Sequence, residues 1–304
     1  MTADGAARSL GRFGVWSSYD RLTAAELIDF ARLVEELGYD TLWVNESAGR
    51  EPFAVLGALA RATTRLTLGL GVASIYARDA VAAHAGARTL ADLSGGRFVM
   101  GLGVSHESSA AVRGHEYEPP LRTMRTYLDG YAEAPYTATA PAAEPPLLLA
   151  ALGPRMLELA AIRSDGAFGY LVTSGWARDA RRVLDDAAAA AGRPARSALV
   201  VSQAAVLGSD RAAHEAARAA VEHHLPQPNY RRNMLRMGFV EADVSVPASD
   251  RLIDALVVQG DEGAIRARVE EMLDAGADHV ALIPISLSGR HADPATTRAA
   301  APPR

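Results

Sequence analysis

The alternation of short apolar runs with longer amphipathic segments is the feature of this 304-residue chain that most restricts its fold. The longer segments repeat apolar residues with helical spacing, whereas the short runs are typical of buried strands. Strands and helices that alternate in this way form βα units around a parallel sheet. We predict eight strands, at residues 13–17, 41–45, 66–72, 98–103, 147–151, 166–172, 199–204 and 279–284.

The segment 23–37 has the clearest helix boundaries. Thr23 followed by Glu26 matches a capping box, and Gly38 is typical of a helix end. Other helical patterns occupy residues 53–62, 80–93, 121–131, 154–162, 177–191, 212–224 and 262–275. Eight strand–helix pairs without a break in composition predict one (β/α)₈ barrel, a TIM barrel, over residues 1–304. A six-stranded doubly wound sheet with additional elements is the alternative.

Two connections are longer than a compact domain usually needs. They span residues 104–120 and 224–258, and we predict that the second is a helical insertion. Long connections often act as lids or binding elements. Residues 1–10 and 286–304 have no periodic pattern, which predicts mobile tails.

The chain contains neither cysteine nor lysine, and all 31 basic residues are therefore arginine. The absence of cysteine excludes disulfides, thiol nucleophiles and protein-bound iron–sulfur clusters. The absence of lysine excludes Schiff-base enzymes and P-loop nucleotide binding.

The overall charge and hydrophobicity predict a cytoplasmic protein that acts on small molecules. The net charge is only -5, and no cluster of like charge indicates a nucleic-acid surface. No segment approaches the roughly 20 apolar residues that span a bilayer. The histidines do not form a metal-binding motif, since His223 and His224 are adjacent and point apart on a helix.

Active sites of such barrels lie where the strands end, so polar residues at these positions are catalytic candidates. Glu46 follows the second predicted strand, where a partly buried carboxylate could act as an acid or base. His106 follows the fourth strand and is a candidate proton donor. Each could instead lie in an ordinary loop that faces water.

The turn after the fifth strand contains Gly153, Pro154 and Arg155. Proline suits the first position of a helix, and the free N–H groups of a first helical turn can bind a phosphate. The same residues also occur in simple strand-to-helix turns. Glycines 101 and 103 do not extend to a dinucleotide motif, because the third glycine position is His106.

Several long strings resemble a known family. They are LGYDTLWVNES, LGLGVASIYARDAVAAHAGARTLADLSGGRFVMGLGVSH, AALGPRMLELAAIRSDGAFGYL, LPQPNYRRNMLRMGF and ASDRLIDALVVQGDEGAIRARVEEMLDAGADHV. These are similar to luciferase-like oxidoreductases, and most closely to the branch that uses the deazaflavin coenzyme F420. The resemblance covers roughly residues 12–285 and also implies a homodimer.

The resemblance implies where the cofactor and substrate bind. The family has a non-prolyl cis peptide under the cofactor ring, which matches Gly71-Val72 here. The expected cofactor-binding residues are Gly71, Val72, Ala73, Gly103, Val104, Leu152, Gly153, Pro154 and Arg155, with the phosphate at the last four. The candidate substrate-binding residues are Ser47, Asn229 and Tyr230, although Asn229 and Tyr230 could instead simply anchor the insertion.

The chain departs from the related F420-dependent sugar-phosphate dehydrogenases at their catalytic positions. Those enzymes carry Asp-His after the second strand and Glu after the fourth, where this chain has Glu46-Ser47 and Val104. Oxidation of a sugar phosphate is therefore not expected. The sequence predicts hydride transfer between F420 and a small organic substrate. An FMN-dependent monooxygenase and a non-catalytic cofactor-binding barrel are the alternatives.

Overall fold

The structure is a computed structural model that describes residues 10–193, 196–289 and 291–303. Eight parallel strands close into a barrel because β10 pairs with both β1 and β8. This arrangement confirms the predicted TIM barrel and excludes the doubly wound sheet. The barrel strands are β1 (Phe13–Ser17), β2 (Thr41–Val44), β3 (Thr67–Leu70), β5 (Phe98–Gly103), β6 (Leu147–Ala150), β7 (Gly166–Gly169), β8 (Ala198–Leu207) and β10 (His279–Ile285).

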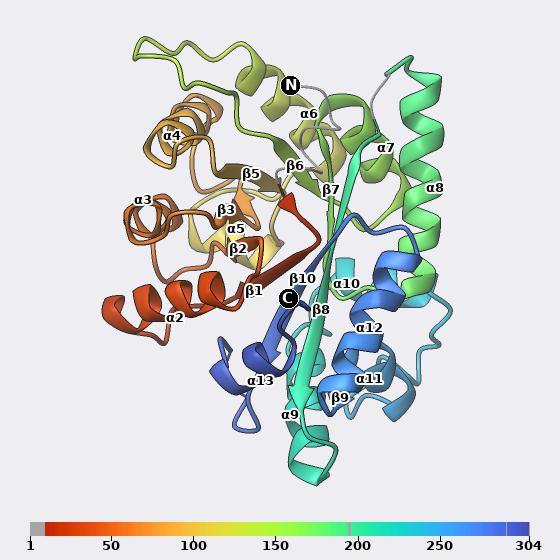
Figure 1. Ribbon diagram of the computed structural model, residues 1–304. Coiled ribbons are helices and arrows are strands. Elements are labelled where there is room, and N and C mark those ends of the chain that lie inside the picture. The colour runs from red at the N-terminus through yellow and green to blue at the C-terminus, as the bar shows by residue number, and fades with distance from the viewer. Residues whose placement is uncertain (1–9, 194–195, 290, 304) are drawn as a thin grey trace.

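Helices surround the strands, as Figure 1 shows, with α2, α3 and α4 on one flank and α7 and α8 on the opposite one. The predicted capping box is present, because Thr23 Oγ1 accepts from Glu26 N and Glu26 Oε2 accepts from Thr23 N. The longer helices are α2 (Ala24–Glu36), α3 (Pro52–Ala62), α4 (Ala80–Leu93), α6 (Pro120–Ala132), α7 (Pro154–Arg163), α8 (Ser174–Ala190), α9 (Arg211–Glu222) and α12 (Glu262–Asp274), the last of which precedes β10.

Two short strands differ from the sequence prediction. The third predicted strand, 66–72, ends at Leu70 as β3, and a separate short strand, β4 (Ala73–Ser74), follows the cis peptide between Gly71 and Val72. The expected insertion 224–258 ends in a further strand, β9 (Val257–Gly260). It pairs with Ala204–Leu207, the half of β8 that extends beyond the pairing with β7.

Short helices occupy the two long connections and the C-terminal segment. They are α5 (Glu107–Val112), α10 (Pro228–Arg236), α11 (Asp250–Leu256) and α13 (Pro294–Ala299). The last of these lies in the segment 286–304, where the sequence shows no periodic pattern, and the expected mobility of this segment stays a prediction. Asp293 caps α13, and the Tyr39 hydroxyl donates to Thr297 O, so local capping and a long-range contact stabilise this helix. Residues 1–9 of the other expected tail lie outside the described residues.

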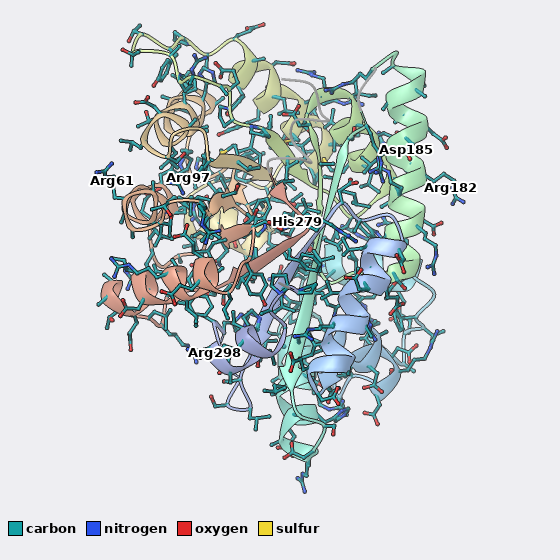
Figure 2. The ribbon with its side chains drawn as sticks, viewed as in Figure 1. Arg61, Arg97, Arg182, Asp185, His279 and Arg298 are labelled. Carbon is teal, nitrogen blue, oxygen red and sulfur yellow. The ribbon has the colours of Figure 1, made fainter. Side chains whose placement is uncertain are left out.

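Aromatic side chains and one histidine fill the barrel interior. Trp43 packs edge-on against Phe168 and His279, and Figure 2 shows His279 near the centre of the molecule. Trp43 Nε1 donates to His279 Nε2 at 3.0 Å, so the Nδ1 proton of His279 is the one donated to Gly11 O at 2.9 Å. Burial lowers the pKa of His279 to about 4. The ring is therefore a neutral part of the core.

Candidate active site

A cavity of about 440 Å³ opens where the barrel strands end. Its walls come from the ends of β1 to β7, from α5, and from the segment that contains α10. Eight of the site residues predicted from sequence line this cavity. They are Glu46, Ser47, Gly71, Val72, Ala73, Gly103, His106 and Tyr230.

The cis peptide between Gly71 and Val72 lies in the cavity wall. The indole of Trp16 donates from Nε1 to Gly71 O at 2.5 Å. The glycines of β5 leave room for this part of the chain, because a Cβ at Gly101 would lie 2.2 Å from Leu70 O and one at Gly103 would lie 2.7 Å from Val72 Cγ2. The β5 glycines are therefore required by the backbone bulge of the neighbouring strand.

Glu46 is almost fully buried, with 4% of its side chain exposed, and both carboxylate oxygens are engaged. Oε2 accepts from Ser74 N at 2.7 Å and from Arg78 Nη1 at 3.1 Å. Oε1 accepts from Arg78 Nη2 at 2.5 Å. This bidentate pair ties β4 to the end of β2. The geometry suits a residue that positions the cavity wall better than the predicted acid or base.

Ser47 lies at the cavity wall, but its hydroxyl already has partners. Oγ donates to Asp20 Oδ2 at 2.6 Å and accepts from Gly49 N at 3.0 Å. Its carbonyl oxygen accepts from Arg113 Nη2 at 3.0 Å. Arg113 follows α5, so this bond connects the loops after β2 and β5 across the rim of the cavity.

The structure brings together three predicted residues that are far apart in sequence: His106, Asn229 and Tyr230. His106 begins α5, and its ring centroid lies 5.3 Å from that of Tyr230 on α10. Burial lowers the pKa of His106, and a hydrogen bond with the Asn229 side chain opposes this shift. Asn229 does not line the cavity, so any effect of Asn229 on a ligand would pass through its hydrogen bond with His106.

An aromatic wall completes the cavity, and sequence reasoning missed four of its members: Trp16, Phe168, Tyr170 and His224. Tyr170 lies 5.2 Å from Trp16 and 5.7 Å from Tyr230, measured between ring centroids. Its hydroxyl is 3.2 Å from His224 Nε2. Burial raises the pKa of Tyr170 above its ordinary value and lowers the pKa of His224 to about 3, so both are neutral near pH 7.

The signal for Tyr170 was present in the sequence, because the residue directly follows β7. The predicted strand 166–172 included Tyr170, so this residue did not stand out as one that follows a strand. His224 was considered only as a metal ligand, and its position opposite Tyr170 depends on the long connection that follows α9.

Ser105 has a left-handed backbone conformation at the end of β5, with φ of 59°. Such a conformation is uncommon for a non-glycine residue and often occurs at functional sites. Its carbonyl oxygen accepts from the Tyr117 hydroxyl at 3.2 Å. This bond holds the start of the β5–α6 connection at the cavity.

The predicted phosphate residues form a separate corner outside the cavity. Gly153 precedes α7, Pro154 is its first residue, and no side chain caps this helix. A Cβ at Gly153 would lie 3.2 Å from Arg236 Nη1, so the guanidinium at the end of α10 lies over the first turn of α7. Arg236 forms no ion pair within the described part of the chain.

The other predicted cofactor residues have structural contacts. Leu152 O accepts from Trp176 Nε1 at 3.0 Å, and Arg155 is exposed. Val104 packs against the hydrophobic core and does not line the cavity. Of the predicted ring contacts, only the one at Val104 lies outside the cavity wall.

Within residues 10–193, 196–289 and 291–303, no group of three or more His, Cys, Asp or Glu side chains could hold a metal ion. None of the helices formed by these residues is both long and apolar enough to cross a membrane.

Comparison with known proteins identifies the family. The model of the luciferase-like monooxygenase family matches residues 8–279. The chain belongs to this family. A 5,10-methylenetetrahydromethanopterin reductase of Methanolobus tindarius is 26% identical over 294 residues, which cover 84% of this chain and 89% of the relative. A protein of Mycobacterium tuberculosis named as a coenzyme F420-dependent oxidoreductase is 30% identical over 186 residues, which cover 51% and 53% of the two chains.

A solved structure shares the fold of this family member. The coenzyme F420-dependent tetrahydromethanopterin reductase of Methanopyrus kandleri has a TM-score of 0.74 at 18% identity. The match covers 95% of this chain and 96% of that one. The resemblance to the luciferase-like family is thus confirmed, and the protein is an enzyme of the oxidoreductase type.

Proposed function

We propose that this luciferase-like enzyme is an F420-dependent oxidoreductase that transfers a hydride between the deazaflavin and a small organic substrate. The observation that carries the proposal is the combination of an aromatic cavity against the Gly71–Val72 bulge with a separate uncapped helix terminus beside Arg236. A cofactor that contains both a flat ring and a phosphate would place the ring in the cavity and the phosphate at the helix terminus. The name of the Mycobacterium tuberculosis relative supports F420 as the cofactor.

The residues present fit this cofactor. Gly71, Val72, Ala73 and Gly103 offer a flat, small-residue surface against which a ring would bind. The N-terminus of α7 at Gly153 would hold the phosphate, because free N–H groups and the helix dipole favour an anion. Arg236 would add a charge-assisted hydrogen bond to the same phosphate.

The cofactor, when bound, supplies or accepts the hydride at its C5 atom. The chain orients the ring and substrate and excludes water from the cavity. Trp16 fixes the carbonyl group of Gly71, and the pair of Glu46 and Arg78 fixes β4 beside it. His106 and Tyr230 form the opposite wall, where they would contact the substrate.

An FMN-dependent monooxygenase is the second candidate function. The description of the family as luciferase-like monooxygenases supports it. The two functions differ in which reduced cofactor is consumed and in whether oxygen is required. A deazaflavin has carbon in place of the flavin N5 atom and does not activate oxygen, so turnover without oxygen favours the F420 reaction.

The test is a fluorescence titration of the purified protein with F420, with FMN, and with the phosphate-free fragment of F420. We expect selective binding of F420. Arg236→Gln should weaken F420 binding by about tenfold, because it removes a charge-assisted hydrogen bond. It should leave binding of the phosphate-free fragment unchanged.

The control is Arg182→Gln on α8, an exposed residue paired with Asp179 and labelled in Figure 2. This variant should bind F420 like the wild type. Selective binding of FMN by the wild-type protein would overturn the F420 proposal. Equal effects of the Arg236 and Arg182 substitutions would remove only the role of Arg236.

A further inference from the structure

Tyr170 and His224 form a hydrogen-bonded pair in the cavity wall. Tyr170 follows β7 and His224 follows α9, and their rings meet edge to face at a centroid distance of 5.2 Å. The hydroxyl oxygen and Nε2 are 3.2 Å apart. Within the described residues, His224 is the one hydrogen-bond partner of this hydroxyl. Both side chains line the cavity, so the pair faces the place where a substrate would bind.

The direction of this hydrogen bond decides what the pair can offer to a ligand. If Nε2 carries the imidazole proton, it donates to the tyrosine oxygen, and the tyrosine proton is free to point into the cavity. If Nδ1 carries it, Nε2 accepts the tyrosine proton, and the hydroxyl offers only lone pairs. In the first tautomer Tyr170 can donate a hydrogen bond to a ligand, whereas in the second it can only accept one.

Three polar groups of the cavity wall that were predicted from sequence have other partners. The Glu46 carboxylate accepts from Arg78 and Ser74, and the Ser47 hydroxyl donates to Asp20. His106 is hydrogen-bonded to Asn229. The hydroxyl groups of Tyr230, Ser74, Ser105, Ser108 and Ser109 also line the cavity, but among the described residues Tyr170 is the one whose hydroxyl is hydrogen-bonded to a histidine.

We propose that the Tyr170 hydroxyl donates to the substrate atom that receives the electron pair, and that the Nε2–H group of His224 positions it. The inference rests on the proposed hydride transfer and names its substrate class: compounds with a reducible C=O or C=N bond. Tyr170 would be a catalytic residue, whereas His224 acts through it. A C=C bond that is not conjugated to such a group would gain nothing from this donor.

A carbonyl substrate would gain one hydride and one proton. Hydride from the reduced deazaflavin forms the new C–H bond, and the π pair of the C=O bond moves onto oxygen. The oxygen takes the Tyr170 proton, because an alkoxide is far more basic than a phenolate. The Nε2–H bond of His224 stabilises the phenolate until solvent returns a proton. The reverse sequence oxidises an alcohol.

The surroundings of the pair favour a planar, uncharged reacting group. Trp16 and Tyr230 flank Tyr170, with ring centroids 5.2 and 5.7 Å away. Burial keeps His224 neutral by lowering its pKa, so the pair carries no charge that would attract an anion. A conjugated carbonyl compound would stack on these rings while its oxygen meets the hydroxyl.

The first test needs neither cofactor nor substrate. Nitrogen-15 NMR of histidine-labelled protein at neutral pH distinguishes the two tautomers, and His224→Gln identifies the His224 signals. We expect the proton on Nε2, with its resonance shifted in Tyr170→Phe and unchanged in Tyr230→Phe. A proton on Nδ1 would overturn the proposal, since Nε2 would then accept from Tyr170.

The second test uses 4-(dimethylamino)cinnamaldehyde, whose absorption band moves to longer wavelength when its carbonyl oxygen accepts a hydrogen bond. We expect this shift in F420-loaded wild type and in Tyr230→Phe, and its loss in Tyr170→Phe, with about tenfold weaker binding. His224→Gln should reduce the shift without abolishing it. Absence of the shift in wild type, or its persistence in Tyr170→Phe, would overturn the inference.

The F420 titration in the same samples separates the two proposals. If F420 binds but the probe shift does not depend on Tyr170, the inference fails and the proposed function stands. If F420 does not bind, the proposed function fails, whatever the tautomer of His224 is.

Discussion

The indole N–H group of Trp16 donates to the carbonyl oxygen of Gly71, and this bond connects the first barrel strand to the cis peptide after the third. The two residues are 55 positions apart in sequence. The bond therefore exists only once the barrel has formed, and it fixes the wall on which the cofactor ring is proposed to bind.

Substitution of Trp16 by Phe should weaken both the fold and cofactor binding. The variant leaves the buried Gly71 carbonyl group without its donor, which should lower the free energy of unfolding by about 1 to 3 kcal/mol. F420 affinity should fall as well. Urea denaturation and fluorescence titration measure the two effects. Tyr39→Phe, which removes a hydroxyl bound to Thr297 O, should lose stability but retain F420 affinity.

The buried pair of Glu46 and Arg78 leads to a prediction about stability. Arg78→Met leaves an unpaired carboxylate that is 4% exposed, and it should cost about 3 to 5 kcal/mol. Glu46→Gln should cost less, because its side-chain oxygen can still accept from Ser74 N and Arg78 keeps Glu51. Arg122→Met, which breaks an exposed pair with Glu118, should cost at most about 1 kcal/mol. Similar losses in the two arginine variants would contradict this account.

Two glycines should respond to alanine in opposite ways. A Cβ at Gly101 would lie 2.2 Å from the carbonyl oxygen of Leu70, so Gly101→Ala should destabilise the protein by about 2 kcal/mol or more. A Cβ at Gly57, inside α3, would meet only Leu90 at 4.0 Å. Gly57→Ala should therefore stabilise the protein by about 0.5 to 1 kcal/mol. Thermal unfolding of both variants checks the difference in sign.

Acid should destabilise the protein through its buried histidines. The pKa of His279 is about 4 in the folded protein, below the ordinary value of 6.5, so the unfolded chain binds a proton that the folded chain does not. The contribution of His279 is complete above pH 6.5 and is lost as the pH falls towards 4. The difference of roughly 2.5 pKa units corresponds to about 3 kcal/mol.

Urea denaturation at several pH values between about 4 and 7 measures this effect. His279→Gln should give a shallower dependence of unfolding free energy on pH than the wild type. His224→Gln should do the same, since the pKa of His224 is about 3 in the folded protein. An unchanged slope in both variants would show that other groups control the acid transition.

The sequence predicted the barrel because each strand–helix unit carries its own local signals. The capping box of Thr23 and Glu26 and the apolar stripe of α2 depend on neighbours within a few positions. The additional elements depend on distant contacts instead. Strand β9 pairs with the end of β8 on the side that β7 does not reach, and α13 has a long-range contact to Tyr39.

The candidate site likewise combines residues that local patterns predict with contacts between distant residues that they do not. Glu46 and His106 could be found because they follow predicted strands, and Gly71 because it lies near the end of one and matches the family's cis peptide. The role of Glu46 could not, since Arg78 lies 32 positions away and the carboxylate has no free oxygen. The pairing of Tyr170 with His224 spans 54 positions and a helix, and no local pattern indicates it. The homodimer stays a prediction of the family resemblance.

Helix α10 extends from the cavity wall to the turn at Gly153. Asn229 and Tyr230 near its start reach His106, while Arg236 at its end lies over Gly153. Seven residues of helix span about 10 Å. We expect so short a helix to move as a rigid body. If F420 binds as proposed, its phosphate at Gly153 and Arg236 would set the orientation of α10 and so of Tyr230 in the cavity wall, and we then expect steady-state kinetics in which the coenzyme must bind before the substrate.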